Sequence, residues 1–167
     1  MQVSPDILRG ILSDVWGYDD FKPQQMDIIS MVTSGKDVVA LLPTGGGKSI
    51  CFQVPGLALG GLTVVISPLI SLIEDQVKQL KDRGISAHAF VGEMSASAFY
   101  QVLDMAQAGS IKFLYLSPER ATSKRFLERL PHLGVTLLAI DEAHCVSQWG
   151  HDFRPSYQRL TSLRNRL

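Results

Sequence analysis

The 167-residue sequence lacks most of the features that assign a chain to a specialised class. Its two cysteines, Cys51 and Cys145, are far apart and do not have the paired spacing of a zinc site or a disulfide framework. No apolar run approaches the length that a membrane span needs, and the N-terminus lacks the basic and apolar regions of a signal peptide. We therefore expect a protein that is not secreted and lies in the cytoplasm, or in the nucleus if the organism is eukaryotic. Cys51, in a predicted helix, is expected to be a buried, reduced thiol.

The sequence also lacks an excess of charge of either sign. Lys and Arg total 16, Asp and Glu total 16, and the formal net charge is zero. Bulk electrostatics therefore give no reason to expect a nucleic-acid or membrane partner, and polyanion binding would need a local cluster. One cluster follows the last acidic residue, Asp152, and it contains Arg154, Arg159, Arg164 and Arg166. This cluster is consistent either with a solvated basic face of a terminal helix or with a surface that binds a polyanion.

Composition and periodicity predict one α/β domain over residues 1–167. Hydrophobic residues make up 46% and charged residues 19%, as in soluble globular proteins. Ser4 and Pro5 predict a helix to about residue 15, and a second helix from Pro23 has Met26, Ile28, Ile29 and Met31 on its apolar side. Strands are expected at 38–42, 62–66, 87–91, 112–116 and 137–140, and they alternate with helices at 48–57, from Ser67-Pro68 to Gly84, up to residue 107, and at 122–130. This alternation predicts a parallel sheet with helices on both faces.

The first chemical signal is the glycine-rich segment at residues 44–49, which follows the apolar run at 38–42. Backbone N–H groups free of side-chain bulk can wrap a polyphosphate, so Thr44, Gly45, Gly46 and Gly47 are candidate phosphate ligands. Lys48 would reach the β/γ-phosphates, and Ser49 would offer a hydroxyl to Mg²⁺. The structural alternative is a flexible turn, since the strict pattern has glycine where this chain has Leu42.

The second signal is Asp141-Glu142-Ala143-His144, which follows the apolar run at 135–140. Asp141 is a candidate ligand of the metal, and Glu142 would orient and deprotonate an attacking water. The alternative is a solvated helix start. Because both junctions follow expected parallel strands, where α/β sheets bind their ligands, they jointly predict binding and hydrolysis of a nucleoside triphosphate.

Four further segments accompany the two junctions: residues 16–25, residues 67–76, residues 115–120, and the run Cys145-Val146-Ser147-Gln148-Trp149-Gly150-His151-Asp152-Phe153-Arg154-Pro155. With them the chain, from about Val15 to its end, resembles the first RecA-like lobe of a RecQ-family DNA helicase of superfamily 2. The resemblance implies a RecA-like P-loop fold, ATP and Mg²⁺ as cofactors, and DNA as a partner that the parent protein would unwind 3′ to 5′ in recombination and repair.

The resemblance also implies roles for individual residues. Tyr18 and Lys22 would stack on adenine, where the family usually has arginine in place of Lys22, and Gln25 would read the edge of the base. Ser67 and Ser117 would contact the DNA backbone, Trp149 and Phe153 would stack on unpaired bases, and Arg154 would add a cation. Gln148 or His151 would link hydrolysis to DNA contact. The structural alternatives are a helix start for residues 18–25, helix capping for the two serines, and a groove plug for the aromatic run.

Family members also have a second RecA-like lobe that supplies an arginine, and larger members have zinc-binding and winged-helix regions. We see none of these in the sequence, so we expect a fragment or one domain whose isolated hydrolysis is very slow. Two other functions remain open. One is a non-catalytic module that binds nucleotide or DNA, and the other is an RNA helicase lobe. The segment from Trp149 to Arg154 favours the RecQ type over the RNA helicase.

Overall fold

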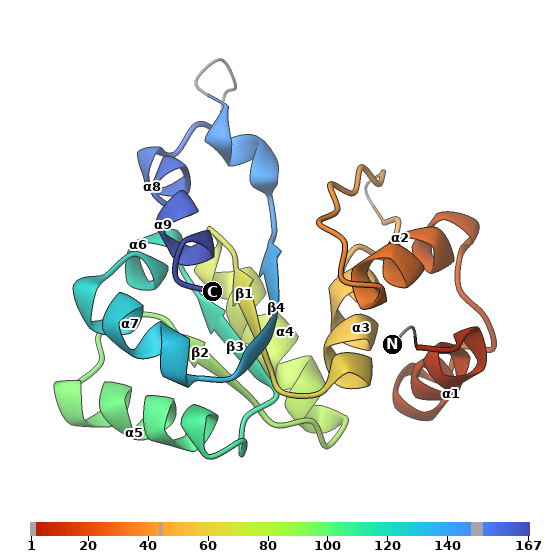
Figure 1. The fold of residues 1–167 in the computed structure, drawn as a ribbon, viewed down its shortest axis with the longest axis horizontal. Helices are drawn as coiled ribbons and strands as arrows, with labels where there is room; N and C mark the ends of the chain where they lie inside the picture. The colour runs from red at the N-terminus through yellow and green to blue at the C-terminus, as the bar shows by residue number, and fades with distance from the viewer. Residues whose placement is uncertain (1–2, 44, 148–151) are drawn as a thin grey trace. The chain divides into compact units, whose positions relative to one another are not determined.

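The computed structural model describes residues 3–43, 45–147 and 152–167 (Figure 1). The chain divides into two compact units, residues 1–60 and residues 61–167. The first unit is helical and the second contains a β-sheet. Each unit has its own buried core, so the two are described in turn.

Three helices form the first unit: α1 (Pro5–Trp16), α2 (Pro23–Thr33) and α3 (Ile50–Leu59). The predicted start of α1 is confirmed, because the Ser4 side chain accepts a hydrogen bond from the Ile7 N–H and Pro5 is the first helical residue. Leu8, Ile29 and Val54 meet in the core of this unit. The predicted apolar side of α2 is only partly right, since Met31 is exposed.

The strand predicted at residues 38–42 is wrong. This segment has no regular secondary structure, and Val39 and Leu41 are each 89% exposed. A β-strand needs a neighbouring strand to pair its backbone N–H and C=O groups. The described part of the first unit contains no other strand, so the apolar run has no partner within its own unit.

The second unit contains a parallel sheet of four strands: β1 (Leu62–Ile66), β2 (Ala87–Phe90), β3 (Phe113–Leu116) and β4 (Val135–Ile140). Their order is β2-β3-β1-β4, and Val64 of β1 is paired with Leu114 of β3 and Leu138 of β4. These four strands were predicted within two residues. Since all of them run the same way, their carboxyl ends meet at one edge of the sheet, where α/β proteins bind ligands.

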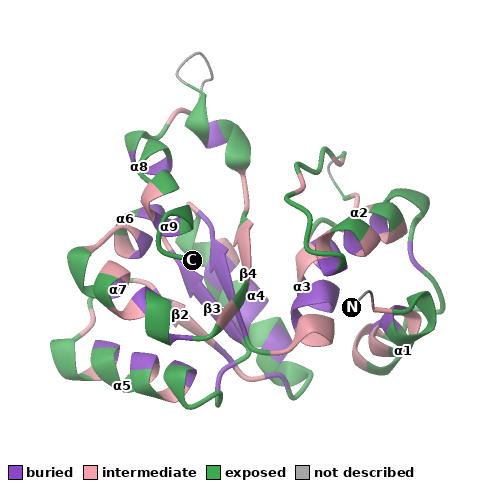
Figure 2. Cartoon of the chain, in the orientation of Figure 1, coloured by how far each residue is buried: buried purple, intermediate pink, exposed green. Residues whose placement is uncertain are grey.

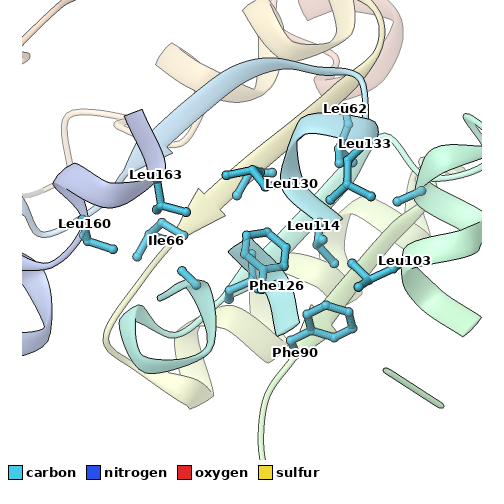
Figure 3. Packing of buried hydrophobic residues seen from close by; sticks show 14 of the residues in the cluster. Leu62, Ile66, Phe90, Leu103, Leu114, Phe126, Leu130, Leu133, Leu160 and Leu163 are labelled. Atoms are coloured by element: carbon cyan, nitrogen blue, oxygen red, sulfur yellow. The ribbon is translucent and has the colours of Figure 1, made fainter. Parts of the chain in front are cut away.

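Helices cover both faces of this sheet, as predicted. On one face, α5 (Ala96–Gln107) and α7 (Lys124–Arg129) pack over Val64, Leu114 and Phe90, with Phe126 and Leu103 in the centre of the core (Figure 3). On the other face, α4 (Ile70–Asp82) contacts β2 and β3. Strands β1 and β3 are buried along their whole length, whereas β4, at the edge of the sheet, is mostly half-exposed (Figure 2). The predicted α/β fold class is therefore confirmed.

The turns between these elements depart from two predictions. Helix α4 begins at Ile70, so Ser67 does not cap it, whereas its predicted end at Gly84 is confirmed. The helix predicted at 122–130 is α7 followed by a 3₁₀ turn (Leu130–His132). An additional short helix, α6 (Pro118–Ala121), precedes it, because Ser117 and Ser123 each cap a new helix. The chain continues through a second 3₁₀ turn, η2 (Ala143–Val146), α8 (Pro155–Gln158) and α9 (Thr161–Arg164). Among the described helices, none is long and apolar enough to cross a membrane.

Candidate nucleotide and metal site

Three glycines of the phosphate loop have conformations or surroundings that exclude a side chain. Gly45 and Gly47 have φ of +75° and +74°, in the left-handed region that glycine adopts without strain. The Gly46 N–H donates to the Pro43 carbonyl at 2.8 Å, and a Cβ at Gly46 would lie 2.8 Å from that oxygen. A Cβ at Gly47 would lie 2.3 Å from Gln25 Nε2. A side chain at any of these three positions would therefore meet backbone strain, a steric overlap or both.

The side chains of Gln25 and Lys22 hold this path. Gln25 is 5% exposed, its Nε2 donates to the Gly47 carbonyl at 3.1 Å, and its Oε1 accepts from the Lys22 N–H at 2.8 Å. Lys22 Nζ donates to the Gly45 carbonyl at 2.9 Å. The segment predicted to recognise adenine thus contacts the loop predicted to bind phosphate. Gln25 is the third residue of α2, where a glutamine reaching back to the preceding N–H is typical of a capping box.

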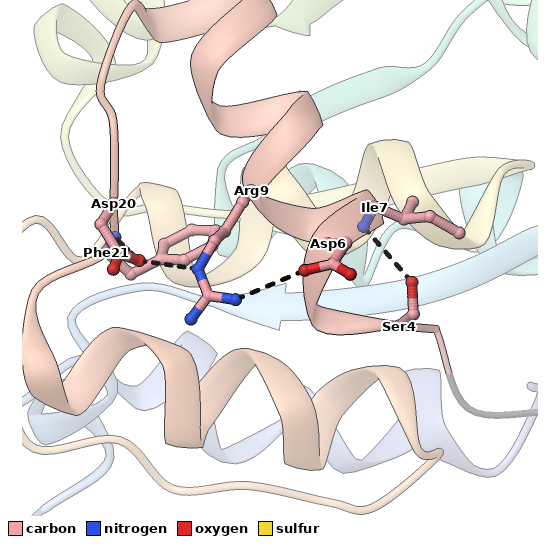
Figure 4. A network of polar contacts seen from close by, with 6 residues as sticks. All are labelled: Ser4, Asp6, Ile7, Arg9, Asp20 and Phe21. Atoms are coloured by element: carbon pink, nitrogen blue, oxygen red, sulfur yellow. Dashed lines mark hydrogen bonds and ion pairs between the residues drawn. The ribbon is translucent and has the colours of Figure 1, made fainter.

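Tyr18 lies on the surface before α2 and is 56% exposed. The turn that presents it is tied to α1 by a small polar network (Figure 4). Asp20 accepts hydrogen bonds from the Phe21 N–H at 2.8 Å and from Arg9 Nε at 3.1 Å, and these contacts lower the pKa of the Asp20 carboxyl. Phe21 is buried against the core of the first unit. Tyr18 therefore has an exposed ring on an anchored turn, as base stacking would require.

Lys48 and Ser49 come directly before α3, and their carbonyls accept from the N–H groups of Cys51 at 3.0 Å and Gln53 at 2.8 Å. Ser49 makes no side-chain capping bond to the helix. Cys51 Sγ lies 3.8 Å from the Gly47 carbonyl oxygen. Burial raises the pKa of the Cys51 thiol to about 11. The predicted loop-to-helix context is therefore present for both residues. Thr44, the remaining predicted phosphate ligand, lies outside the described residues.

Asp141 and Glu142 form a sharp turn at the carboxyl end of β4. The Asp141 N–H donates to the Ile66 carbonyl of β1 at 2.8 Å, which extends the sheet by one bond. Glu142 has φ of +53°, and no other described residue besides glycine has a positive φ. The left-handed region costs a residue with a side chain roughly 1–2 kcal/mol. Such strain is found mainly where function requires it, so the observation supports the predicted role of Glu142.

Hydrogen bonds and close polar contacts surround this turn. The Glu142 N–H donates to Asp141 Oδ1 at 2.9 Å, and the Cys145 N–H donates to the Glu142 carbonyl at 3.0 Å. His144 lies between two carboxylates, with Nδ1 3.3 Å from Glu142 Oε2 and Nε2 3.5 Å from Asp152 Oδ2. The turn is therefore linked to Asp152, within the aromatic run that the sequence analysis singled out.

Sequence reasoning missed the contacts of α8 with this turn and with α6, which are made by Tyr157, Ser156 and Glu119. The Tyr157 hydroxyl donates to the Asp141 carbonyl at 2.8 Å, and Tyr157 is buried. Partial desolvation favours the neutral form of Glu119, but hydrogen bonds from its own N–H, Ser156 and Ser117, with the nearby Arg154 charge, outweigh it and lower the Glu119 pKa. No local signal predicts these contacts, because they join α8 to segments 16 or more residues away.

The residues predicted to contact DNA have different surroundings. The Ser67 hydroxyl is buried and has no hydrogen-bond partner, while the Ser67 N–H donates to the Leu116 carbonyl at 3.1 Å. Ser117 caps α6 by accepting from the Arg120 N–H at 3.3 Å. Phe153 is half-buried and Arg154 is exposed. Trp149 and His151 lie outside the described residues.

The donor set of the chain suits a magnesium ion that brings its own phosphate ligands. Among the residues that the structure describes, no group of three or more His, Cys, Asp or Glu could hold a metal ion alone. Mg²⁺ is usually bound through one or two carboxylates, with nucleotide phosphates and water completing its shell. The Asp141 carboxylate of the second unit and the Ser49 hydroxyl of the first are each a donor of the kind that this mode of binding uses.

Comparison with known proteins agrees with these features. A family model described as "DEAD/DEAH box helicase" matches residues 22–166. The chain is 48% identical over 160 residues to the probable ATP-dependent DNA helicase RecS of Bacillus subtilis, covering 96% of this chain and 32% of that protein. It is 46% identical over 156 residues to the ATP-dependent DNA helicase RecQ of the same organism, covering 93% of this chain and 26% of that protein.

A eukaryotic relative shows the same pattern. The chain is 45% identical over 168 residues to the ATP-dependent helicase wrn-1 of Caenorhabditis elegans, covering 99% of this chain and 16% of that protein. The chain therefore spans a third or less of the length of these relatives. The match nevertheless covers most of the chain, including both junctions. The chain belongs to the DEAD/DEAH box helicase family, and its predicted resemblance to the RecQ members is confirmed.

Proposed function

We propose that this chain is the ATP-binding lobe of a RecQ-like 3′–5′ DNA helicase. The observation that carries the proposal is the phosphate loop, in which two left-handed glycines, Gly45 and Gly47, lead into Lys48, Ser49 and helix α3. A loop of this kind presents backbone N–H groups and a helix N-terminus to phosphate. The names of the relatives, which are ATP-dependent DNA helicases, support ATP as the nucleotide.

In this proposal the residues of the two junctions have separate tasks. Lys48 neutralises charge on the β- and γ-phosphates, while Ser49 and Asp141 are ligands of Mg²⁺. The magnesium ion, when bound with ATP, withdraws charge from the phosphate oxygens. Glu142 orients the attacking water and accepts its proton. The strained backbone of Glu142 supports this assignment, because its side-chain direction is fixed by the turn and does not depend on rotamer choice alone.

We further propose that Tyr18 and Lys22 stack on adenine and that Gln25 reads its edge. The exposed ring of Tyr18 on an anchored turn supports the stacking role. The contacts of Lys22 and Gln25 with the loop carbonyls add a consequence. Because the same two side chains would contact the base and hold the phosphate loop, recognition of the base and the position of the loop would be coupled.

DNA is the proposed macromolecular partner, by stacking and backbone charge. The half-buried ring of Phe153 and the exposed cation of Arg154 support contact with a single strand, and Trp149 and His151 are proposed to act with them. Ser117, at the start of α6, is proposed to contact the DNA backbone. The Ser67 hydroxyl is buried, so it would contact the DNA backbone only after its turn opens. A second RecA-like lobe, supplying an arginine to the phosphates, would complete hydrolysis and unwinding in recombination and repair.

The test of the proposal is the affinity of this chain for Mg·ATP, measured by titration calorimetry on Lys48→Ala. Removing a charged hydrogen-bond donor from a phosphate should weaken binding roughly 10- to 150-fold. The matched control is Lys36→Ala, which removes an exposed lysine of the same unit and should bind like the wild type. Equal affinity of Lys48→Ala and Lys36→Ala would refute the assignment of the loop to phosphate.

A further inference from the structure

The peptide unit that joins Asp141 to Glu142 is held at both of its polar atoms. Its carbonyl oxygen accepts from the Tyr157 hydroxyl at 2.8 Å. Its N–H donates back to Asp141 Oδ1 at 2.9 Å. A peptide is planar, so fixing both atoms fixes the rotation of this plane about the chain. That rotation sets the φ angle of Glu142, and the hydrogen bond from the Glu142 N–H to Oδ1 ties the Asp141 carboxylate to the same plane.

Tyr157 is built to hold that carbonyl in a fixed place. Its ring is 3% exposed and belongs to the main core cluster of the second unit, together with Cys145 and Leu160. The neighbouring backbone is also anchored, since the Arg154 N–H donates to the Cys145 carbonyl at 2.9 Å. The phenol therefore reaches the turn from a packed position, and its hydroxyl has little freedom to move.

The same short helix is tied to a second segment at the same edge of the sheet. Ser156, next to Tyr157, is 7% exposed and hydrogen-bonds to the Glu119 carboxylate of α6. Helix α8 thus contacts both the Asp141–Glu142 turn and the turn that begins at Ser117. Phe153 and Arg154, which we propose to contact DNA, come directly before this helix.

We propose that Tyr157 is a positioning residue for Asp141 and Glu142. Its hydroxyl holds the peptide between them in the orientation that directs the Asp141 carboxylate to the metal and keeps Glu142 in its left-handed conformation. Helix α8 follows Phe153 and Arg154 directly. A DNA strand bound at those residues would therefore shift the orientation of the two carboxylates through this hydroxyl. The inference rests on the proposed function of the two carboxylates.

The test is Tyr157→Phe, which removes the hydroxyl and keeps the ring. Its matched control is Tyr100→Phe, the same change at a tyrosine of α5 that is 38% exposed. ATP affinity is measured with Mg²⁺ and again with EDTA. We expect Tyr157→Phe to lose about five-fold in the Mg²⁺-dependent part of the affinity, the factor that one net hydrogen bond represents. Its affinity in EDTA should match that of the wild type and of Tyr100→Phe.

Two further measurements separate positioning from simple packing. In an Asp141→Asn background the Tyr157→Phe change should have no further effect on Mg²⁺-dependent affinity, since the two residues act through one contact. Backbone hydrogen exchange at Glu142 and Cys145 should be faster in Tyr157→Phe and unchanged in Tyr100→Phe. The exchange measurement needs no nucleotide, so it tests the structural link independently.

The outcomes distinguish this inference from the proposed function. If the wild type shows no Mg²⁺-dependent affinity for ATP, the proposed function fails. If the wild type binds Mg·ATP and Tyr157→Phe behaves like Tyr100→Phe in both affinity and exchange, only the role of Tyr157 fails. A Tyr157→Phe chain that does not fold would also overturn the proposal, because the hydroxyl would then support the fold and not the turn.

Discussion

The two chemical junctions of this chain follow similar apolar runs but are built in different ways. The run before Asp141 is a true strand whose ladder continues to the Asp141 N–H, whereas the run before the phosphate loop is not a strand. The loop is held by two side chains, Gln25 and Lys22, that reach its carbonyls. At the other junction Tyr157 performs the corresponding task. At both junctions, side chains outside the motif hold the backbone of the residues that we propose to carry the chemistry.

The largest expected effect is that of Gly47→Ala compared with Gly45→Ala. Both changes place a side chain at a left-handed φ, which should cost roughly 1–2 kcal/mol of unfolding free energy. Gly45 has open space around it, but a Cβ at Gly47 would overlap Gln25 Nε2. Gly47→Ala should therefore also lose the Gln25 contact, about 1 kcal/mol more. Chemical denaturation of both variants measures the difference.

The same pair of variants tests whether Gln25 really holds the loop. In a Gln25→Ala background the overlap is removed, so Gly47→Ala should cost no more than Gly45→Ala. If the difference in unfolding free energy between the two glycine variants is unchanged in that background, Gln25 does not hold the loop.

A smaller effect is expected at the second junction, where introducing a glycine should stabilise the fold instead of destabilising it. Glu142→Gly should be more stable than Glu142→Gln by about 1 kcal/mol, because glycine adopts the left-handed φ without strain. Both variants remove the carboxylate that we propose to activate water, so both should lose the slow hydrolysis of ATP expected of this lobe. Thermal unfolding monitored by circular dichroism gives the stabilities. Should the glutamine variant be the more stable, the conformation of Glu142 would not be a strained one.

The smallest expected effect is a difference in thiol reactivity. Cys51 follows the phosphate loop and Cys145 follows Glu142, both buried, so each reports on the opening of its own junction. Burial raises the pKa of both thiols, so at pH 8 each is protonated in the folded chain and reacts mainly after local opening. Because the described residues before the phosphate loop contain no strand with inter-strand hydrogen bonds, Cys51 should react several-fold faster than Cys145.

Labelling with a chromogenic disulfide at pH 8 measures this ratio, using Cys145→Ala and Cys51→Ala to isolate each thiol. Saturating Mg·ATP should slow the reaction of Cys51, since a bound phosphate would hold the loop closed. Equal rates at the two cysteines would mean that the side chains around the phosphate loop hold it as firmly as a sheet holds the Asp141 turn.

Sequence alone predicted the parts of this structure that depend on local chemistry. The strand at Leu62–Ile66 is a fully buried apolar run, and Ser4 with Pro5 fixed the start of α1. Prediction failed where the outcome depends on distant partners. Residues 38–42 have strand composition but no neighbouring strand in the described part of their unit. Ser67 and Ser117 both precede proline after a strand, yet only Ser117 caps a helix.

The site shows the same limit. The residues that carry the chemistry, Lys48, Ser49, Asp141 and Glu142, were predicted from two short motifs, and their roles stay predictions. The residues that hold these motifs were not foreseen in that capacity. Gln25 was assigned to the base and Tyr157 to nothing, because the Gln25–Gly47 and Tyr157–Asp141 contacts span 22 and 16 positions of the chain. No periodicity or local pattern specifies a pairing across such a distance.

The left-handed backbone of Glu142 has a consequence for anyone who evolves this protein in the laboratory. A selection for heat resistance alone would reward glycine or asparagine at position 142, since both tolerate that conformation better than glutamate. The selected variants would be more stable and would lack the carboxylate that we propose to activate water. If that role holds, stability and hydrolysis compete at position 142, and a screen for stable variants needs an activity assay as well.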